Sequence, residues 1–473
     1  MNMNKIYINV ILAILLSVFL GSCDKYLNVE PKSSLSEDEM FASEAGFQQA
    51  LSGVYASLAS RNLYGDNFTM GFVSALAQNY ATSGEGNLFV ETRAYNYTSL
   101  EVSEYVTGTW SGAYNAIASV NNILKFSESN RSVLSNNSYQ QIRGEALAIR
   151  ALLHFDLLRL FAPAYAVDPS AQAIPYKVSI DQYSVGPSSV SEIIGFVLSD
   201  LKEAETLLEG LDPIFANTMQ RRFKLNYYAV KGLQARVYLY KGENSEAYTA
   251  AKTVIDSEKF PFVDQSAVNT SSAGIKDRLF MSELVFALRN RDLSSWAVDA
   301  YFTFYINSTY RLTRPSADIA TIYEANTNDL RYGNLFENSS DVLFPSKFWQ
   351  TSTSTIDSTR LDRMIPVVRM SELRYIMAET APSLSESLDQ LNLVRLGRHL
   401  TEFPKDASTL NSTFIQAEIT KEYQKECYAE GQLFFFYKRL NFSQIQFAPT
   451  TFGTSVYVLP IPENEKEFNN YYQ

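Results

Sequence analysis

The sequence predicts a mainly α-helical protein, a tetratricopeptide-like helical repeat array with irregular aromatic-rich insertions. Apolar residues recur at intervals of three and four along most of the chain, as they do on one face of a helix. Two helix pairs, at about 225–257 and 372–396, share a similar length and turn. In the first pair, Ala235, Tyr238 and Ala247 lie close to tetratricopeptide spacing, in which small residues let paired helices approach. Residues 262–365 lose this period and predict an irregular insertion.

Each predicted helix follows from its own apolar period and end signals. Ser43 is an expected N-cap for the first helix, with Glu44 in its first turn. A strong helix is expected over 139–161. From 146 to 161 it is nearly apolar around much of its circumference, which predicts a central helix that Pro163 stops. Residues 453–462 predict a short apolar strand or extended segment. The helices are expected at 43–58, 105–126, 139–161, 190–209, 225–240, 245–257, 372–379, 385–396 and 413–440.

Composition excludes several classes of function. Forty Lys and Arg against 51 Asp and Glu give a net charge of −11, which argues against a nucleic-acid binder. Two histidines and two cysteines cannot supply a four-cysteine zinc site or a disulfide framework. The chain also lacks a Gly-rich phosphate loop and a nucleophile elbow. We therefore expect no cofactor and no metal site.

The N-terminus predicts a lipid anchor. Lys5 precedes an apolar run over 6–20, which is too short to span a bilayer comfortably but suits a signal peptide. The run ends in Leu-Gly-Ser before Cys23, which looks like a bacterial lipobox, so residues 1–22 would be removed and Cys23 lipidated. An ordinary secretory signal with a chance cysteine is the alternative. Cys427 is expected to be a buried, inert thiol.

Several segments of the chain match, in order, the segments of one known family. The segment 144–161, which reads GEALAIRALLHFDLLRLF, resembles the signature helix of the SusD/RagB family of outer-membrane nutrient-uptake lipoproteins. Trp110, Tyr114, Ile117 and Asn121 precede it in a W-x-x-x-Y-x-x-I-x-x-x-N pattern. Further similar blocks occur at 23–31, 228–240, 366–379, 391–395, 422–439 and 459–462.

The resemblance implies a fold, a location and a partner. It implies one SusD-like domain over 23–473, with four tetratricopeptide-like helix pairs on one side. Its parts would be a leader (24–42), an N-terminal helical region (43–261), a ligand-binding insertion (262–365) and a C-terminal helical region (366–473). Family members sit on the cell outer membrane, bind glycans or peptides without catalysis, and pass them to a SusC-like TonB-dependent transporter.

Aromatic and polar residues outside the helices are candidates for ligand contact, because sugars are bound by flat rings together with amides, carboxylates or Arg. Trp296 is the strongest candidate, since it follows two serines rather than lying in an apolar stripe. Trp110, by contrast, is expected in the core. Packing of the aromatics onto the helices is the alternative for each candidate. The complete set is Tyr64, Asp66, Asn67, Phe68, Trp296, Tyr301, Tyr305 and Trp349.

Charged residues on the central helix are expected to form ion pairs rather than a catalytic cluster, because buried charges are costly unless paired. These residues are Glu145, Arg150, Asp156 and Arg159. His154 on the same helix is expected to be a hydrogen-bonded core residue. A surface glycoside hydrolase and a pure helical scaffold remain alternatives, as does a peptide-binding protein, but the sequence favours a glycan-binding protein without catalysis.

Overall fold

The computed structural model describes residues 36–82, 87–180, 183–212, 218–302, 310–339, 342–349, 355, 360–406, 410–449 and 453–472. The predicted signal peptide and Cys23 lie outside these residues. The described part is mainly helical, as predicted. One continuous hydrophobic core reaches from Phe41 to Leu459. Among the described helices, none is both long enough and apolar enough to cross a membrane.

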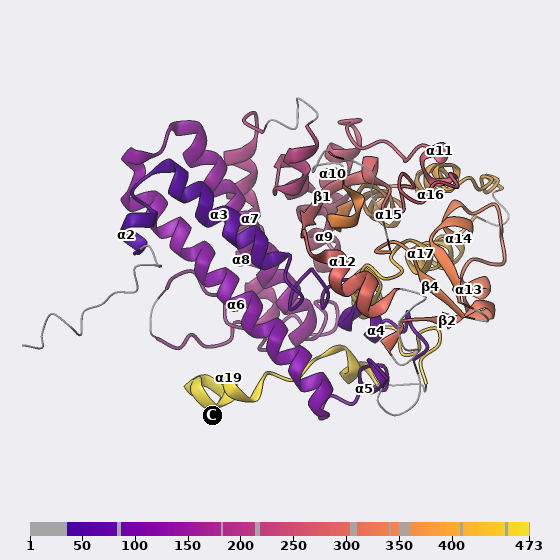
Figure 1. Ribbon diagram of the computed structural model, residues 1–473, viewed down its shortest axis with the longest axis horizontal. Coiled ribbons are helices and arrows are strands. Elements are labelled where there is room, and N and C mark those ends of the chain that lie inside the picture. The colour runs from indigo at the N-terminus through magenta and orange to yellow at the C-terminus, as the bar shows by residue number, and fades with distance from the viewer. Residues whose placement is uncertain are drawn as a thin grey trace, which may run out of the picture.

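The helices form an array in which each packs on the next along the chain (Figure 1). The long helices of the first half lie side by side at one end of the molecule, and the array continues through a second group. The first group contains α3 (Glu44–Leu58), α6 (Leu100–Ser129), α7 (Asn136–Phe161) and α8 (Val190–Leu208). The second contains α9 (Tyr227–Lys241), α10 (Asn244–Ile255), α15 (Met370–Thr380), α16 (Leu384–Gly397) and α17 (Ser412–Glu426).

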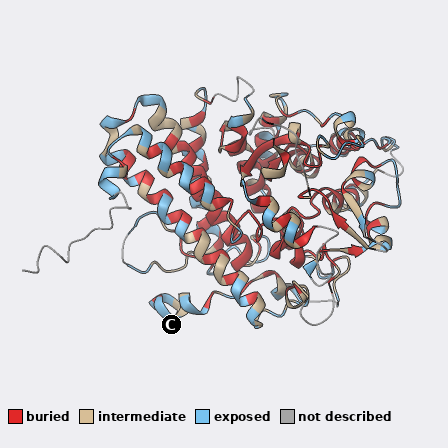
Figure 2. Ribbon diagram, viewed as in Figure 1, coloured by how far each residue is buried: buried red, intermediate tan, exposed pale blue. Residues whose placement is uncertain are grey.

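Helix α7 is the central helix, as its apolar sequence predicts. Every residue from Gly144 to Phe161 is buried, and Figure 2 shows buried residues along the inner helices of the array. The Ser135 side chain caps the helix by accepting from the Ser138 amide. The predicted N-cap Ser43 is confirmed on α3, where it accepts from the Gly46 amide.

The segment predicted as an irregular insertion contains two small sheets. Strand β1 (Leu284–Arg289) pairs antiparallel with β5 (Met364–Arg369) and thereby closes the insertion at its base. The second sheet has the order β2-β4-β3, from β2 (Arg314–Pro315), β4 (Val342–Pro345) and β3 (Phe336–Ser339). The insertion also contains the short helices α11 (Gln265–Val268), α12 (Leu293–Trp296), α13 (Ser316–Ile322) and α14 (Leu330–Asn334).

The helix predicted over 413–440 is wrong in one respect, because the structure divides it into α17 and α18 (Gln432–Arg439). Gly431, just before α18, has a φ of +80°, which a helix does not allow. A Cβ on Gly431 would lie 1.9 Å from the Phe68 carbonyl oxygen, so this glycine permits a close approach of two backbones. Within 453–462 the chain forms a 3-10 turn at Thr454–Tyr457 and no strand, and Val458 after the turn has the extended backbone that was the alternative prediction.

The remaining elements are short. They are α2 (Glu37–Met40), α4 (Phe72–Leu76), α5 (Val90–Arg93), α19 (Glu463–Phe468), and the turns Arg131–Val133, Met219–Phe223, Met281–Glu283, Ala297–Tyr301, Leu361–Arg363 and Asn470–Tyr472.

Stability is expected to fall in acid because α17 carries a buried carboxylate, Glu422. Burial opposes its ionisation, but the charges of Arg331 and Lys425 outweigh that effect and lower its pKa from 4.5 to about 2. Since the folded pKa lies below the unfolded one, this stabilisation is complete above pH 4.5 and is lost as the pH falls towards 2. Urea unfolding at pH 7 and pH 3 should show this loss, and Glu422→Gln should flatten the dependence. An equal pH dependence in the variant would contradict the assignment to Glu422.

Candidate ligand-binding face

The loop between α3 and α4 is tied to the insertion by the buried carboxylate of Asp66. Arg61 Nη2 donates to Asp66 Oδ2 at 3.0 Å, and the Tyr301 hydroxyl donates to the same oxygen at 2.7 Å. Burial raises the pKa of Asp66, although both partners favour its ionised form. The Asp66 side chain is 3% exposed and that of Arg61 is 53% exposed. The Arg61 guanidinium is therefore held in place while it still reaches solvent.

Trp296 lies beside the same loop. Its indole N–H donates to the Gly65 carbonyl oxygen at 3.0 Å, and the ring is half-buried against the core. The hydrogen bond fixes one edge of the indole, and part of the ring remains exposed. A fixed, flat aromatic surface next to a charged hydrogen-bond donor is typical of sites that bind sugar rings. The structure thus brings two of the predicted stretches, 64–68 and 296–301, together.

Three of the predicted contact residues are core side chains, which corrects their assignment. Tyr64, Asn67 and Phe68 are 2%, 4% and 1% exposed. The Tyr64 hydroxyl donates to Asp156, and the Asn67 amide donates to Thr109 at 3.0 Å. Their polar atoms are thus used within the fold, and they offer no surface to a ligand in this conformation.

Asp66 and Tyr301 are also buried, at 2% each, so their assignment as direct contacts is corrected too. They support the site by orienting Arg61, which sequence reasoning missed. Its only sequence signal was its position at the start of an aromatic, amide-rich loop.

Tyr305 and Trp349 are the two remaining candidates. Tyr305 falls within 303–309, outside the described residues. Trp349 is half-buried after β4, with its ring 5.2 Å from the Arg278 guanidinium carbon and 6.1 Å from the Phe344 ring. Trp349 follows β4, which lies to the right of α12 in Figure 1.

The charged residues of α7 form structural ion pairs, as predicted. Glu145 lies 2.5 Å from Arg221, Arg150 lies 2.7 Å from Asp200, and Asp156 pairs with Arg159. The first two pairs join α7 to neighbouring segments and the third lies within the helix, so both carboxylates of α7 take part in ion pairs.

His154 is a buried core residue, as predicted. It is 0% exposed and accepts from the Lys177 amide through Nε2 at 3.1 Å. Its Nδ1 therefore carries the proton and donates to the Arg150 carbonyl oxygen at 2.9 Å. Burial lowers the pKa of His154 to about 3, so the ring is neutral at physiological pH.

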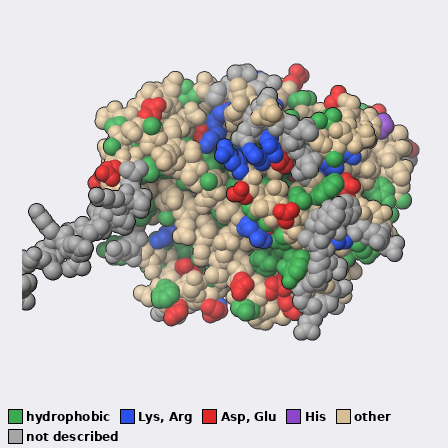
Figure 3. All heavy atoms as spheres, in the orientation of Figure 1, with side chains coloured by type: hydrophobic (Ala, Val, Ile, Leu, Met, Phe, Trp, Pro, Cys, Tyr) green, Lys and Arg blue, Asp and Glu red, His purple; other side chains and the backbone are tan. Residues whose placement is uncertain are grey.

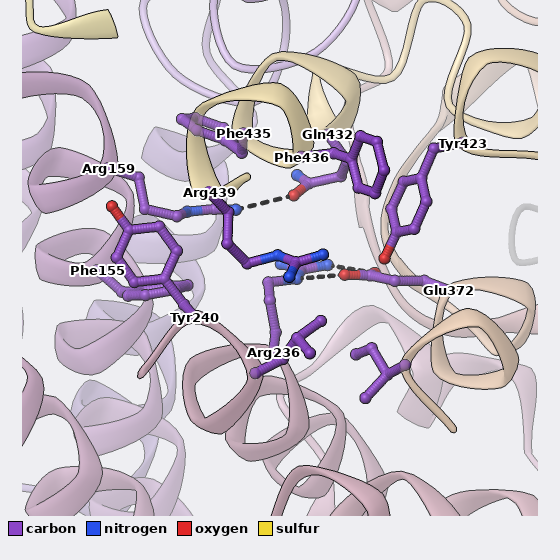
Figure 4. A pocket seen from close by; sticks show the side chains of 12 residues that line it. Phe155, Arg159, Arg236, Tyr240, Glu372, Tyr423, Gln432, Phe435, Phe436 and Arg439 are labelled. Atoms are coloured by element: carbon purple, nitrogen blue, oxygen red, sulfur yellow. Dashed lines mark hydrogen bonds and ion pairs between the residues drawn. The ribbon is translucent and has the colours of Figure 1, made fainter. Parts of the chain in front are cut away.

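A charged cavity lies between α7, α9, α15 and α18 (Figure 4). Arg236 forms an ion pair with Glu372 at 2.6 Å, and Arg159 donates to Gln432 at 3.1 Å. Arg439 lies across the same space. The cavity has a volume of about 30 Å³, which is enough for one water molecule and too small for a sugar ring. The ion pair and the hydrogen bond beside it join the helices across this space.

Residues 25–239 match the SusD-like family described as "Starch-binding associating with outer membrane". SusD-like protein P2 of Formosa agariphila is 26% identical over 275 residues, which cover 56% of this chain and 51% of that protein. SusD-like protein P38 of the same organism is 27% identical over 266 residues, which cover 54% of this chain and 47% of that protein. The chain thus spans about half the length of these two relatives.

Solved structures share the fold over nearly the whole chain. A SusD superfamily protein of Bacteroides thetaiotaomicron has a TM-score of 0.71 and 22% identity, covering 91% of this chain and 99% of that one. A SusD-like carbohydrate binding protein of Bacteroides vulgatus has a TM-score of 0.68 and 17% identity, covering 91% and 97%. The chain is thus similar to the SusD-like family over residues 25–239, and it shares the fold of these solved structures over about nine-tenths of its length.

Proposed function

We propose that this protein binds oligosaccharides at the cell surface through the face around Trp296, and delivers them to a SusC-like TonB-dependent transporter without catalysis. The observation that carries the proposal is the geometry of Trp296, whose indole is fixed to Gly65 while part of its ring is exposed. Arg61, held by Asp66, adds a directed donor for sugar hydroxyls or charged groups.

The comparisons support a carbohydrate ligand. The matching family is described as starch-binding and associated with the outer membrane, and one structure of this fold is a carbohydrate binding protein. The transporter partner follows from the resemblance of the sequence to the SusD/RagB family. The ion-paired charges of α7 support a binding role over hydrolysis, which needs two carboxylates facing the scissile bond.

Native affinity electrophoresis tests the glycan-binding proposal. The chain from residue 24 onward should migrate more slowly through gels that contain its polysaccharide, in a panel of soluble plant, algal and microbial glycans. Retardation without release of reducing ends supports a binding protein, whereas release of reducing ends would identify a hydrolase. If no polysaccharide retards it and peptides bind in calorimetry, the ligand is a peptide instead.

Replacing Cys23 by alanine is expected to release the protein from membranes, because the predicted lipid would be lost. Cell fractionation measures this after expression in a Gram-negative host without the transporter, so that only the lipid can retain the protein. Cys427→Ala is the matched control, since Cys427 is buried and should not affect anchoring. Membrane retention of the Cys23 variant would contradict the anchor.

A further inference from the structure

A second cavity, which we call the α19 pocket, lies where α19 packs beside α6. It has a volume of about 310 Å³, at the lower end of the range of pockets that bind small molecules. Figure 3 shows hydrophobic side chains exposed beside acidic ones at the lower left, where α19 lies in Figure 1. The pocket is lined by Tyr114 of α6, by Lys177, Tyr183 and Ser184 from the segment between α7 and α8, and by Glu465 and Phe468 of α19.

Hydrogen bonds fix the walls of the α19 pocket. The Trp110 indole N–H donates to Glu465 Oε2 at 3.2 Å, which attaches α19 to α6. The Asn469 side-chain amide, directly after α19, donates to Glu465 Oε1 at 2.8 Å and to the Val185 carbonyl oxygen at 3.2 Å. The walls are therefore held in place by the fold, which lowers the entropy cost of binding a ligand between them.

Two aromatic rings at this pocket are exposed to solvent. Tyr183 is 80% exposed and Phe468 is 76% exposed. A single exposed ring is ordinary on a protein surface, but apolar surface that gathers at one cavity is typical of a binding site. The Lys177 ammonium donates to the Tyr183 carbonyl oxygen at 3.0 Å and so holds the backbone that carries this ring.

The polar groups of the α19 pocket suit a sugar. Among the described residues the Lys177 ammonium makes one hydrogen bond, so two of its three N–H groups can donate to a ligand. The Ser184 hydroxyl, which is exposed, can donate or accept. Sugar rings pack their C–H faces on aromatic rings, while a few such polar groups orient their hydroxyls. An acyl chain would cover the rings and leave the ammonium group without a partner.

The α19 pocket and the Trp296 indole lie on opposite sides of α6. A Cβ on Gly108 of α6 would lie 3.2 Å from the side-chain oxygen of Asn62, in the loop that binds the indole. Trp110 and Tyr114 follow two and six residues later, which places them on the other half of the helix. Figure 1 likewise shows α12 and α19 on opposite sides of α6. The two sites are separated by at least the width of a helix, about 10–12 Å.

We propose that the α19 pocket is a second, weaker sugar-binding subsite, which takes a distant part of the same oligosaccharide chain that Trp296 binds; this rests on the proposed glycan-binding function. The sugar packs on the rings of Tyr183 and Phe468, and Lys177 and Ser184 bind its hydroxyl groups. Because the subsite lies across α6 from Trp296, it acts only on chains long enough to reach both.

Two linked sites strengthen the binding of a long chain. Once Trp296 holds one part of the chain, the next part is held near the α19 pocket at an effective concentration of about 1 mM. A subsite with a dissociation constant of about 0.1 mM then raises the overall affinity about tenfold. A short fragment that reaches only one site gains nothing from the second.

Glycan length is the variable that tests this proposal. Soluble starch, laminarin, galactomannan and polygalacturonate are the probes in affinity gels of the chain from residue 24 onward. Calorimetry then compares the polysaccharide that retards the protein most with its own short fragments. Phe468→Ala should weaken binding of the polysaccharide about tenfold and leave binding of the short fragments unchanged, whereas Trp296→Ala should weaken both.

Matched variants separate ring stacking from apolar bulk. Phe468→Tyr keeps the flat ring and should bind the polysaccharide like the unaltered protein, whereas Phe468→Leu should lose affinity like the alanine variant. Leu396→Ala is the control for loss of exposed apolar surface, because Leu396 is 52% exposed on α16, far from α19 in Figure 1. It should leave binding unchanged.

Three results would overturn the proposal in distinguishable ways. Equal polysaccharide binding by Phe468→Ala and Leu396→Ala would reject the subsite and leave glycan binding at Trp296 intact. Loss of short-fragment binding in Phe468→Ala but not in Trp296→Ala would make the α19 pocket the main site instead of a secondary one. Failure of all four polysaccharides to retard the unaltered protein, together with peptide binding in calorimetry, would reject the proposed function itself.

Discussion

Glu426→Ala is expected to lower the free energy of unfolding by about 3–5 kcal/mol, because it removes the shared partner of three buried arginines. Glu426 is 1% exposed and lies 2.6 Å from Arg398, 2.8 Å from Arg369 and 2.9 Å from Arg331. Burial opposes its ionisation, but these arginines outweigh it and hold the pKa of Glu426 well below its usual range. They come from three separate parts of the chain, so the carboxylate joins α17 to β5, α14 and the end of α16.

Urea unfolding at pH 7 measures this loss. Glu463→Ala is the control, because the Glu463 side chain is 86% exposed and its ion pair with Lys466 contributes little. Losses of similar size in the two variants, each below about 1 kcal/mol, would show that the cluster around Glu426 does not support the fold.

Trp296→Ala is expected to weaken glycan binding at least about tenfold, or ~1.4 kcal/mol, because the stacking surface is removed. Stability should fall less than for Glu426→Ala, by about 1–3 kcal/mol, since the ring is only half-buried and a single hydrogen bond to Gly65 is lost. Calorimetry with fragments of the retained polysaccharide measures the affinity.

Trp296→Phe is the matched control. It keeps an aromatic ring and removes the indole N–H, so it should retain more affinity than the alanine variant. Unchanged affinity in Trp296→Ala would move the site away from α12. A loss of affinity that appears only together with unfolding would return Trp296 to the core.

Local sequence signals predicted the helical fold well where they act within one element. The cap at Ser43 and the apolar circumference of 146–161 depend on neighbouring residues, and both predictions are confirmed. The break at Gly431 depends on the Phe68 backbone more than 350 residues away, and no local period reveals it. The β1–β5 pairing is likewise a contact across some 80 residues, so the apolar run at 284–289 does not by itself predict a strand.

The candidate site shows the same difference between local sequence signals and contacts made by residues far apart in the chain. The sequence singled out Trp296 as an aromatic outside the apolar stripes, and in the structure it is half-buried beside Gly65. Tyr64 and Phe68 stand among polar residues, yet they are buried because Asp156 and the core lie opposite them. Arg61 acquires its role only through Asp66 and Tyr301, and the second of these lies 240 residues away.

Fluorine NMR of protein labelled with 5-fluorotryptophan tests the central claim most directly. The chain has three tryptophans, so three resonances are expected, and Trp→Phe variants assign them. A glycan that retards the protein in gels should shift the Trp296 resonance and leave that of Trp110, which is 3% exposed, unchanged. Saturating glycan that leaves the Trp296 resonance unmoved would contradict the account.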